Sequence, residues 1–327
     1  MEQTNGRVGD RVFAMVVMSL ALALIVSLSF VGQSFAQDAT PAATPEVPVS
    51  IAPDAAVITV TAKEDVFSVA VPADGVIEGN FVIELVNETA NNIANVNFVK
   101  LPADTSVGDF TSVLAKSFKG EGGELPTWWN GADATFAGGA FAAPGFTTQS
   151  IVTLSAGRWV VFSSNPGGVQ SAQVINVVTA AEASGEPVAT PVPGATPVAE
   201  ASPVATTLPS DDQITITTSG FEPASAPSAD QKIWEVKNTS DQVHDLVIIK
   251  VDGNVDTTAA AALAASFSRG DVVNGLVIGG IGALSPNGVG YVGVKLEAGT
   301  YVLFSSLPDA KGGLQSANGA VTVVTIP

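Results

Sequence analysis

The chain has 327 residues, of which 46% are hydrophobic and 13% charged, and its formal net charge is −18. So acidic a composition argues against binding to nucleic acid or to an anionic membrane surface, because both need Lys and Arg to neutralise phosphate. The chain contains no cysteine and only one histidine, which excludes disulfides, thiolate nucleophiles, iron–sulfur clusters and thiolate metal sites.

The N-terminus, residues 1–36, has the pattern of a signal peptide. Two arginines precede an apolar run from Val12 to Val31, and Ala36 ends a short motif of small residues. We expect cleavage before Gln37 and a secreted or extracytoplasmic protein of the cell envelope. Because the run approaches the length of a membrane span, an uncleaved N-terminal segment is the alternative, and it is the only membrane attachment expected.

Two segments rich in Pro, Ala and Thr divide the rest of the chain. Residues 37–54 and 182–210 together hold half of the 20 prolines. Such segments favour an extended polyproline conformation and do not join sheets. They therefore predict a stalk and an interdomain linker, with domains at 55–181 and 211–327.

The two predicted domains are repeats of each other. The phrase "GRWVVFSSNPGGVQSA" begins at Gly157, and "GTYVLFSSLPDAKGGLQSA" begins at Gly299. Upstream, Leu154 matches Leu296 with the same spacing, and further matching segments follow in the same order. A match sustained over the whole unit indicates a duplicated domain.

Most segments of each unit are short, rich in β-branched residues and bounded by turn residues, as in sandwich strands. In the first unit we predict strands at 56–62, 66–71, 80–87, 95–101, 149–154, 158–164 and 173–179. In the second unit we predict strands at 213–218, 232–238, 245–251, 290–296, 300–306 and 320–326.

Each unit also contains one predicted helix. In the first unit Ser106 can cap a run that ends at Phe118. In the second, Asp256 or Thr257 can cap an alanine-rich run that Gly270 ends. We expect both helices to cover a sandwich edge.

The order of parts in the second unit resembles the cupredoxin family, the blue-copper β-sandwiches. A strand and a turn precede His244, and the unit ends with "LEAGTYVLFSS", a loop and "NGAVTVV". The resemblance implies an all-β protein with two tandem cupredoxin-like Greek-key β-sandwiches, each with one short helix, after a signal peptide.

In that family a Cys, two His and a Met hold copper, and the resemblance implies that these ligands are lost here. Only His244 remains at a ligand place. The other places hold Ala94, Ser163, Gln170 and about Val174 in the first unit, and Ser305, Gln315 and Ala320 in the second.

A type 1 copper site needs a thiolate and two imidazoles, and a serine hydroxyl cannot replace the thiolate. We therefore expect no metal and no cofactor. His244 is expected to be a relic at a loop edge, solvated or hydrogen-bonded. The alternative is a weak copper or zinc site that His244 forms with Asp241 or Asp245, in a copper-linked carrier or sensor.

Two other motifs suggest ligands. In "PTWWNGAD", Trp128 and Trp129 can offer a stacking surface for a sugar or peptide, or one of them covers the sandwich end while the other is half-exposed. The stretch "DGNVDTT" from Asp252 begins like a calcium loop but lacks the required Gly and Glu, so we interpret it as a turn and a helix cap.

No arrangement of nucleophile and base is visible in the sequence, so we expect no enzymatic activity. The predicted function is that of an exported non-catalytic binding or structural protein, whose partner is an unknown protein or glycan of the cell envelope. The alternatives are a copper-linked protein that uses His244 and a carbohydrate- or protein-binding module that uses Trp128 and Trp129.

Overall fold

The computed structural model describes residues 51–64, 66–118, 123–130, 133–163, 171–184, 208–230, 232–271 and 273–327. We call residues 51–184 repeat one and residues 208–327 repeat two. The predicted signal peptide, most of the stalk and most of the linker lie outside the described residues. Contacts group Pro45–Pro327 into one compact unit.

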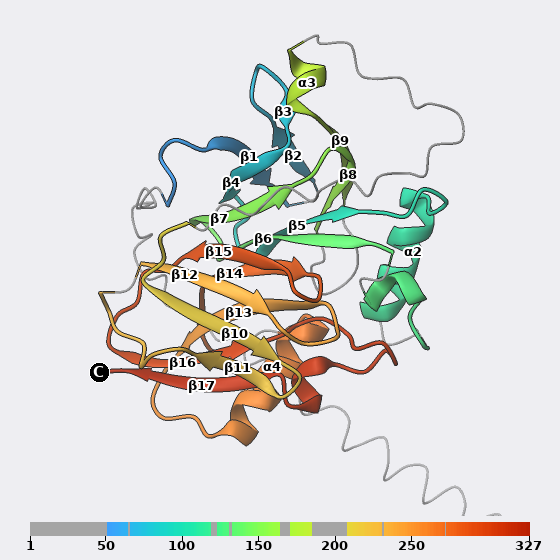
Figure 1. Cartoon of the computed structure of the whole chain (residues 1–327). Helices are drawn as coiled ribbons and strands as arrows, with labels where there is room; N and C mark the ends of the chain where they lie inside the picture. Colours follow the sequence, from blue (N-terminus) through green and yellow to red (C-terminus); the bar gives the residue numbers. More distant parts are fainter. Residues whose placement is uncertain are drawn as a thin grey trace, which may run out of the picture. The chain divides into compact units, whose positions relative to one another are not determined.

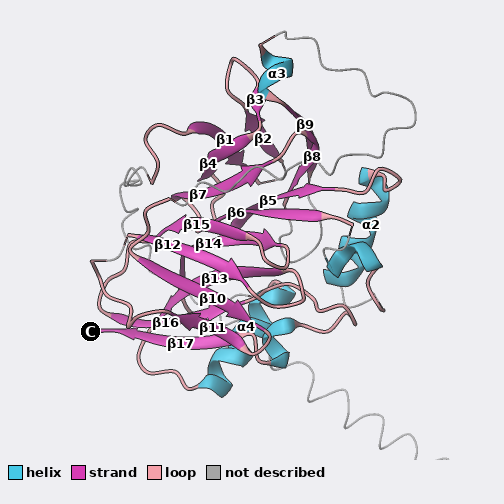
Figure 2. Cartoon of the chain, in the orientation of Figure 1, coloured by secondary structure: helices cyan, strands magenta, loops and turns pink. Residues whose placement is uncertain are grey.

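Repeat one is built mainly from strands (Figures 1 and 2). Its strands are β1 (Ala56–Ala62), β2 (Phe67–Ala70), β3 (Val76–Ile77), β4 (Gly79–Asn87), β5 (Ala94–Lys100), β6 (Thr135–Ala142), β7 (Thr147–Leu154), β8 (Gly157–Phe162) and β9 (Ala172–Val178). Its helices are α2 (Val107–Phe118), the 3₁₀ turn η2 (Thr127–Asn130) and α3 (Ala180–Ala183).

Repeat two has a similar order of strands with its longer helix at the equivalent place, but its 3₁₀ turn lies between the last two strands. Its strands are β10 (Asp212–Thr217), β11 (Gly220–Pro223), β12 (Ile233–Asn238), β13 (His244–Val251), β14 (Leu276–Leu284), β15 (Val289–Gly293), β16 (Gly299–Phe304) and β17 (Val321–Ile326). Its helices are α4 (Thr257–Arg269) and the 3₁₀ turn η3 (Gln315–Asn318). The all-β prediction of two tandem cupredoxin-like sandwiches is confirmed.

The strands of both repeats join into two continuous sheets. One sheet has the order β11-β10-β12-β15-β7-β4-β1-β2, and the other β17-β16-β13-β14-β6-β5-β8-β9-β3. The repeats therefore meet where β7 pairs with β15 and β6 pairs with β14, as Figure 1 shows. The sequence predicted the two sandwiches but did not predict that they share their sheets.

The junction between the repeats has local two-fold symmetry. Val292 of β15 lies opposite Ser150 of β7 in an antiparallel pair. Because Leu154 matches Leu296 in the repeated sequence, Ser150 and Val292 occupy equivalent positions. Opposed equivalent residues are the mark of an isologous contact, as in a two-fold dimer. The chain is thus an intramolecular pseudo-dimer.

The glycine-rich strands β6 and β14 were missed by the sequence analysis, since glycine is disfavoured in strands. In these strands glycine is required because there is no room for a side chain. A Cβ on Gly139 would lie 1.8 Å from the carbonyl oxygen of Val96, and one on Gly280 would lie 2.2 Å from that of Leu246. Both glycines also have positive φ angles, 153° and 155°. Each close approach lies within one repeat, between β5 and β6 in repeat one and between β13 and β14 in repeat two.

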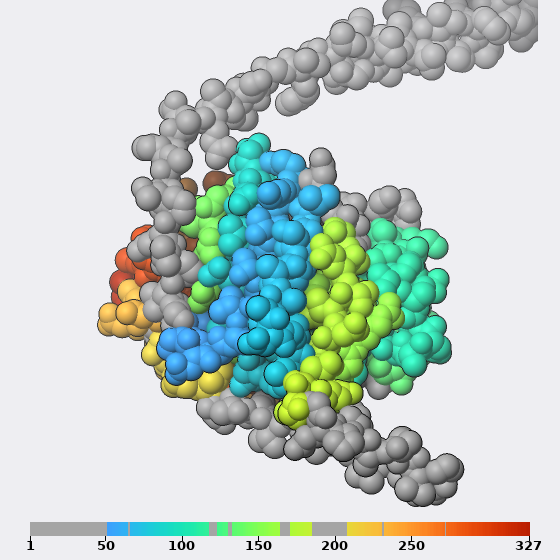
Figure 3. All heavy atoms as spheres, turned by 90° about the horizontal axis from the view of Figure 1, so that it is seen from above, coloured from blue at the N-terminus to red at the C-terminus, as the bar shows by residue number. Residues whose placement is uncertain are grey.

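Hydrophobic side chains fill each sandwich between its two sheets, and full burial of one such side chain contributes roughly 1.5–3 kcal/mol. In repeat one the core includes Phe98 and Trp159, and in repeat two Trp234 and Tyr301. Figure 3 shows repeat one from above, with β1 to β4 in blue and cyan beside β9 in yellow-green and α2 in teal.

The two longer helices cover the outer face of the nine-stranded sheet, and each contacts it through a phenylalanine. The ring of Phe110 on α2 lies 4.9 Å from that of Phe162, and the ring of Phe267 on α4 lies 5.2 Å from that of Phe304. The predicted boundaries of α4 are confirmed, because the Asp256 side chain accepts from the amide of Ala259 and Gly270 ends the helix in the left-handed region. Among the described residues, no helix has the length and apolarity needed to cross a membrane.

Candidate functional site

Strand register shows which residues of the two repeats are equivalent at the site. Asn97 of β5 lies opposite Phe162, and Val247 of β13 lies opposite Phe304. Counting back along β5 and β13 makes Ala94 the counterpart of His244, and Asn95 the counterpart of Asp245. Ser163 directly follows β8 and Ser305 directly follows β16, so the two serines also correspond.

The last ligand place in repeat one needs a correction. The amide of Ser305 donates to the carbonyl of Ala320 at 3.1 Å, and the amide of Ser163 donates to that of Ser171 at 3.3 Å. Ser171 is therefore the counterpart of Ala320, whereas Val174 lies further along β9 and is 45% exposed. Gln170 lies outside the described residues.

A hydrogen-bonded asparagine turn positions the start of β13. The Oδ1 of Asn238 accepts from the amide and the hydroxyl of Ser240, at 3.0 and 2.7 Å. Its Nδ2 donates to the carbonyls of Gln242 and Leu284, at 2.7 and 2.9 Å. These bonds fix the turn from which His244 enters the sheet.

Repeat one contains the same turn. Asn87 Oδ1 accepts from the amide and hydroxyl of Thr89, at 3.0 and 2.8 Å. Asn87 Nδ2 donates to the carbonyls of Asn92 and Ala142, at 2.8 and 2.9 Å. The sequence showed an asparagine before the turn, but it did not show that this side chain satisfies the turn's polar groups in both repeats.

In repeat two the residues at the ligand places are bonded to one another. The hydroxyl of Ser305 donates to Asp245 Oδ1 at 2.8 Å and also contacts Oε1 of Gln315. The amide of Ser306 donates to Asp245 Oδ1 at 2.7 Å, and its hydroxyl donates to Oδ2. The Asp245 carboxyl group therefore lies among the residues at the ligand places and accepts hydrogen bonds from both serines.

Burial changes the acidity of two neighbouring groups. Burial raises the pKa of Asp245 to about 6, against the hydrogen bonds from Ser306 and Ser305 that lower it. Burial lowers the pKa of His244 to about 4, although the negative charge of Asp241 acts in the opposite direction. At neutral pH the His244 ring is uncharged and the Asp245 carboxyl is mostly ionised.

His244 is not at a solvated loop edge, as the sequence suggested. It is 3% exposed, and its Nδ1 is buried with no hydrogen-bond partner among the described residues. Within those residues no group of three or more His, Cys, Asp or Glu side chains has the geometry to hold a metal ion. The side chains at two other ligand places, Ser305 and Gln315, would offer a metal only hard ligand atoms, which do not suit a type 1 copper ion.

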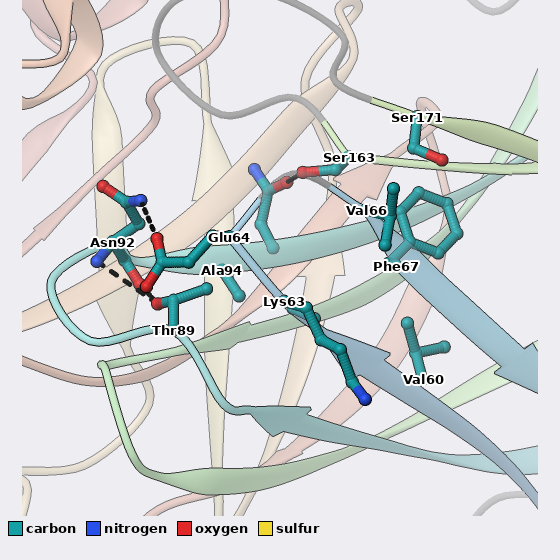
Figure 4. Close-up of a pocket in the computed structure, with 12 residues that line it drawn as sticks. Val60, Lys63, Glu64, Val66, Phe67, Thr89, Asn92, Ala94, Ser163 and Ser171 are labelled. Atoms are coloured by element: carbon teal, nitrogen blue, oxygen red, sulfur yellow. Dashed lines mark hydrogen bonds between the residues drawn. The ribbon is translucent and has the colours of Figure 1, made fainter.

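The equivalent region of repeat one contains a small pocket. Ser163 donates to Asn95 Oδ1 at 3.1 Å, and the pocket beside them has a volume of about 20 Å³. It is lined by Ala94, where repeat two has an imidazole, and also by Lys63 and Glu64 (Figure 4). Such a volume accommodates water rather than a larger ligand.

The two tryptophans do not form a joint exposed stacking surface, because one of them is buried. Trp129 is 1% exposed, and its Nε1 donates to the carbonyl of Pro308 in repeat two at 3.3 Å. Trp128 is half-buried against Phe110, with ring centroids 5.5 Å apart. Trp129 is thus part of the contact between the repeats and is not available to a sugar.

No family model and no curated protein matches the chain. A reduced auracyanin from Roseiflexus castenholzii is similar over 35% of this chain and 94% of its own, with 24% identity and a TM-score of 0.26. Auracyanin A from Chloroflexus aurantiacus, described as a blue copper protein, matches 35% of this chain and 98% of its own at 15% identity and a TM-score of 0.25.

A copper-containing nitrite reductase from Thermus scotoductus is similar over 83% of this chain and 61% of its own, with 11% identity and a TM-score of 0.21. With identities and TM-scores this low, these structures carry no argument about activity. Each repeat of the chain is a cupredoxin-like β-sandwich, and that description concerns the fold alone.

Proposed function

We propose that this protein is an exported, non-catalytic binding or structural protein of the cell envelope or exterior in which both type 1 copper sites have been lost. The observation that supports the proposal most directly is the network in repeat two. There Ser305 and Gln315, at the places of Cys and His, are bonded to each other, and Ser305 is also bonded to Asp245.

Export rests on the signal-peptide pattern of residues 1–36. The absence of a catalytic role rests on chemistry, since the single imidazole of the chain is buried and the buried carboxyl next to it in sequence, Asp245, is engaged by serines. A protein or glycan remains the proposed partner. The net charge of −18 makes nucleic acid an unsuitable one.

A titration of the mature protein with Cu(II) tests the loss of copper. We expect no intense absorption near about 600 nm, because that band needs a thiolate–copper bond. Any weak binding should disappear in His244→Ala and persist in the control Ser163→Ala, because repeat one has no imidazole at the equivalent position, Ala94. A thermal melt that falls by many degrees on adding EDTA would contradict the proposal, because it would reveal a structural metal.

A further inference from the structure

The hydrogen bonds at the lost ligand places of repeat two continue into repeat one. Gln315 Nε2 donates to the carbonyl of Val243 at 2.8 Å and to that of Pro308 at 3.3 Å. The same Pro308 carbonyl accepts from Trp129 Nε1 of repeat one, also at 3.3 Å. One carbonyl oxygen therefore receives a donor from each repeat.

A second bond joins the same loop, residues 307–314, to repeat one. The amide of Leu125 donates to the carbonyl of Ala310 at 2.9 Å. Leu307 is buried in one hydrophobic cluster with Trp129 of repeat one and Val243 of repeat two. The loop is thus the place where the site of repeat two contacts the 125–129 segment of repeat one.

The loop is held from inside repeat two at both of its ends. Ser306, just before it, is bonded to Asp245 through its amide and its hydroxyl. The backbone amide of Gln315, just after the loop, donates to the carbonyl of Leu307 at 3.1 Å. Within the loop, Asp309 accepts from the amides of Lys311 and Gly313.

We propose that the former ligand positions of repeat two have become a latch between the repeats. In this latch Asp245, Ser305, Ser306 and Gln315 fix the loop 307–314, and the loop holds Leu125 and Trp129 of repeat one. The bond between Gln315 and Pro308 sets the position of the carbonyl that Trp129 requires. This role is independent of whether the protein binds a partner, and so goes beyond the proposed function.

The latch is tested by nicking the full chain. A specific protease site is placed within residues 185–207, the protein is cut, and the association of the two halves is measured by dilution and size-exclusion chromatography. The wild-type halves should stay together. Gln315→Ala should weaken their association by roughly tenfold, the effect of losing about one buried hydrogen bond.

Three variants sharpen the test. Ser163→Ala, the matched change in repeat one, should alter the association by less than about threefold, because its bond to Asn95 stays within repeat one. Trp129→Phe removes the donor to Pro308 from the other side and should weaken association as Gln315→Ala does. Asp245→Asn should keep the halves together, since an amide oxygen still accepts from Ser305 and Ser306.

Two results would overturn the latch. In the first, Gln315→Ala and Trp129→Phe lower the melting temperature but leave the association of the nicked halves unchanged, which means the network stabilises repeat two alone. In the second, the nicked wild-type halves separate on their own. If Gln315→Ala does not fold, Trp129→Phe decides the question alone.

Discussion

The two repeats have the same framework but differ at the positions that the cupredoxin resemblance assigns to copper ligands. Repeat two retains an imidazole at His244 and places the Asp245 carboxyl among two serines and a glutamine. Repeat one has Ala94 and Asn95 at the same positions, a hydrogen bond from Ser163 to Asn95, and a pocket of about 20 Å³. The comparison shows that equivalent positions of one framework can hold either a set of bonded polar groups or small side chains beside a pocket.

The largest expected effect tests the framework that the repeats share. Gly139→Ala and Gly280→Ala would each put a Cβ against a carbonyl oxygen, at 1.8 and 2.2 Å, in a strained backbone region. Each should lower the free energy of unfolding by roughly 3 kcal/mol or more, as measured by urea denaturation.

Gly145→Ala is the control for these variants, because Gly145 has a positive φ but no atom within 4 Å of the added Cβ. It should lower the free energy of unfolding by only about 1 kcal/mol. If Gly139→Ala were as mild as this control, the close contact between β5 and β6 would be wrong.

The next largest expected effect is a difference in stability cost between matched substitutions at Asp245 of repeat two and Asn95 of repeat one. Asp245→Ala leaves the amide and hydroxyl of Ser306 without their acceptor, and Ser305 with Gln315 alone, and should cost roughly 3 kcal/mol. Asn95→Ala removes one acceptor for Ser163 beside a pocket that admits water and should cost about 1 kcal/mol. Urea denaturation of both variants measures the difference. Equal losses would show that the two sites are equally important to stability.

The pH dependence of stability should come from two opposing groups. The pKa of Asp245 is raised from 3.8 to about 6, so its neutral form stabilises the fold at low pH, and this stabilisation is lost as pH rises through about 6. The pKa of His244 is lowered from 6.5 to about 4, so its contribution is present above 6.5 and is lost as pH falls towards 4.

These two slopes oppose each other between about pH 4 and pH 6.5. Asp245→Asn should expose the histidine slope, with a melting temperature that rises with pH, whereas His244→Leu should expose the aspartate slope, with a melting temperature that falls. Melts at several pH values measure both, with Asn95→Ala as a control for changes in repeat one. Parallel pH profiles for the two variants would contradict the assignment.

The smallest expected effect concerns the pocket of repeat one. Ala94→Val adds two methyl groups beside a volume of about 20 Å³ and should change the free energy of unfolding by less than about 0.5–1 kcal/mol. Thermal melting measures this. A loss above about 2 kcal/mol would mean that the pocket is already tightly packed.

The sequence predicted most of the fold because its signals are local. Alternating β-branched residues marked β1, β4 and β13, and the cap at Asp256 with the stop at Gly270 marked α4. It did not predict β6 or β14, because a glycine in a strand is explained only by the strand beside it. Here that explanation is the carbonyl of Val96 or of Leu246. The shared sheets were missed for the same reason.

The candidate site was predicted only in part. The repeated phrase located Ser163 and Ser305, and register in the structure agrees with that correspondence. The role of Asp245 was not visible, since nothing in the sequence shows that Ser306 donates to it twice. Nor could the sequence show that Trp129 contacts the loop after Ser306, because 179 residues separate Trp129 from Pro308.

The paired asparagine turns have a consequence for glycosylation. Asn87-Glu88-Thr89 and Asn238-Thr239-Ser240 both match the acceptor sequence for N-linked glycans. In the folded protein the two asparagines are 2% and 0% exposed, and each side-chain nitrogen donates to two carbonyls. An oligosaccharide can therefore be attached only while the chain is unfolded, and a chain that carries one there cannot close the turn from which its β5 or β13 begins.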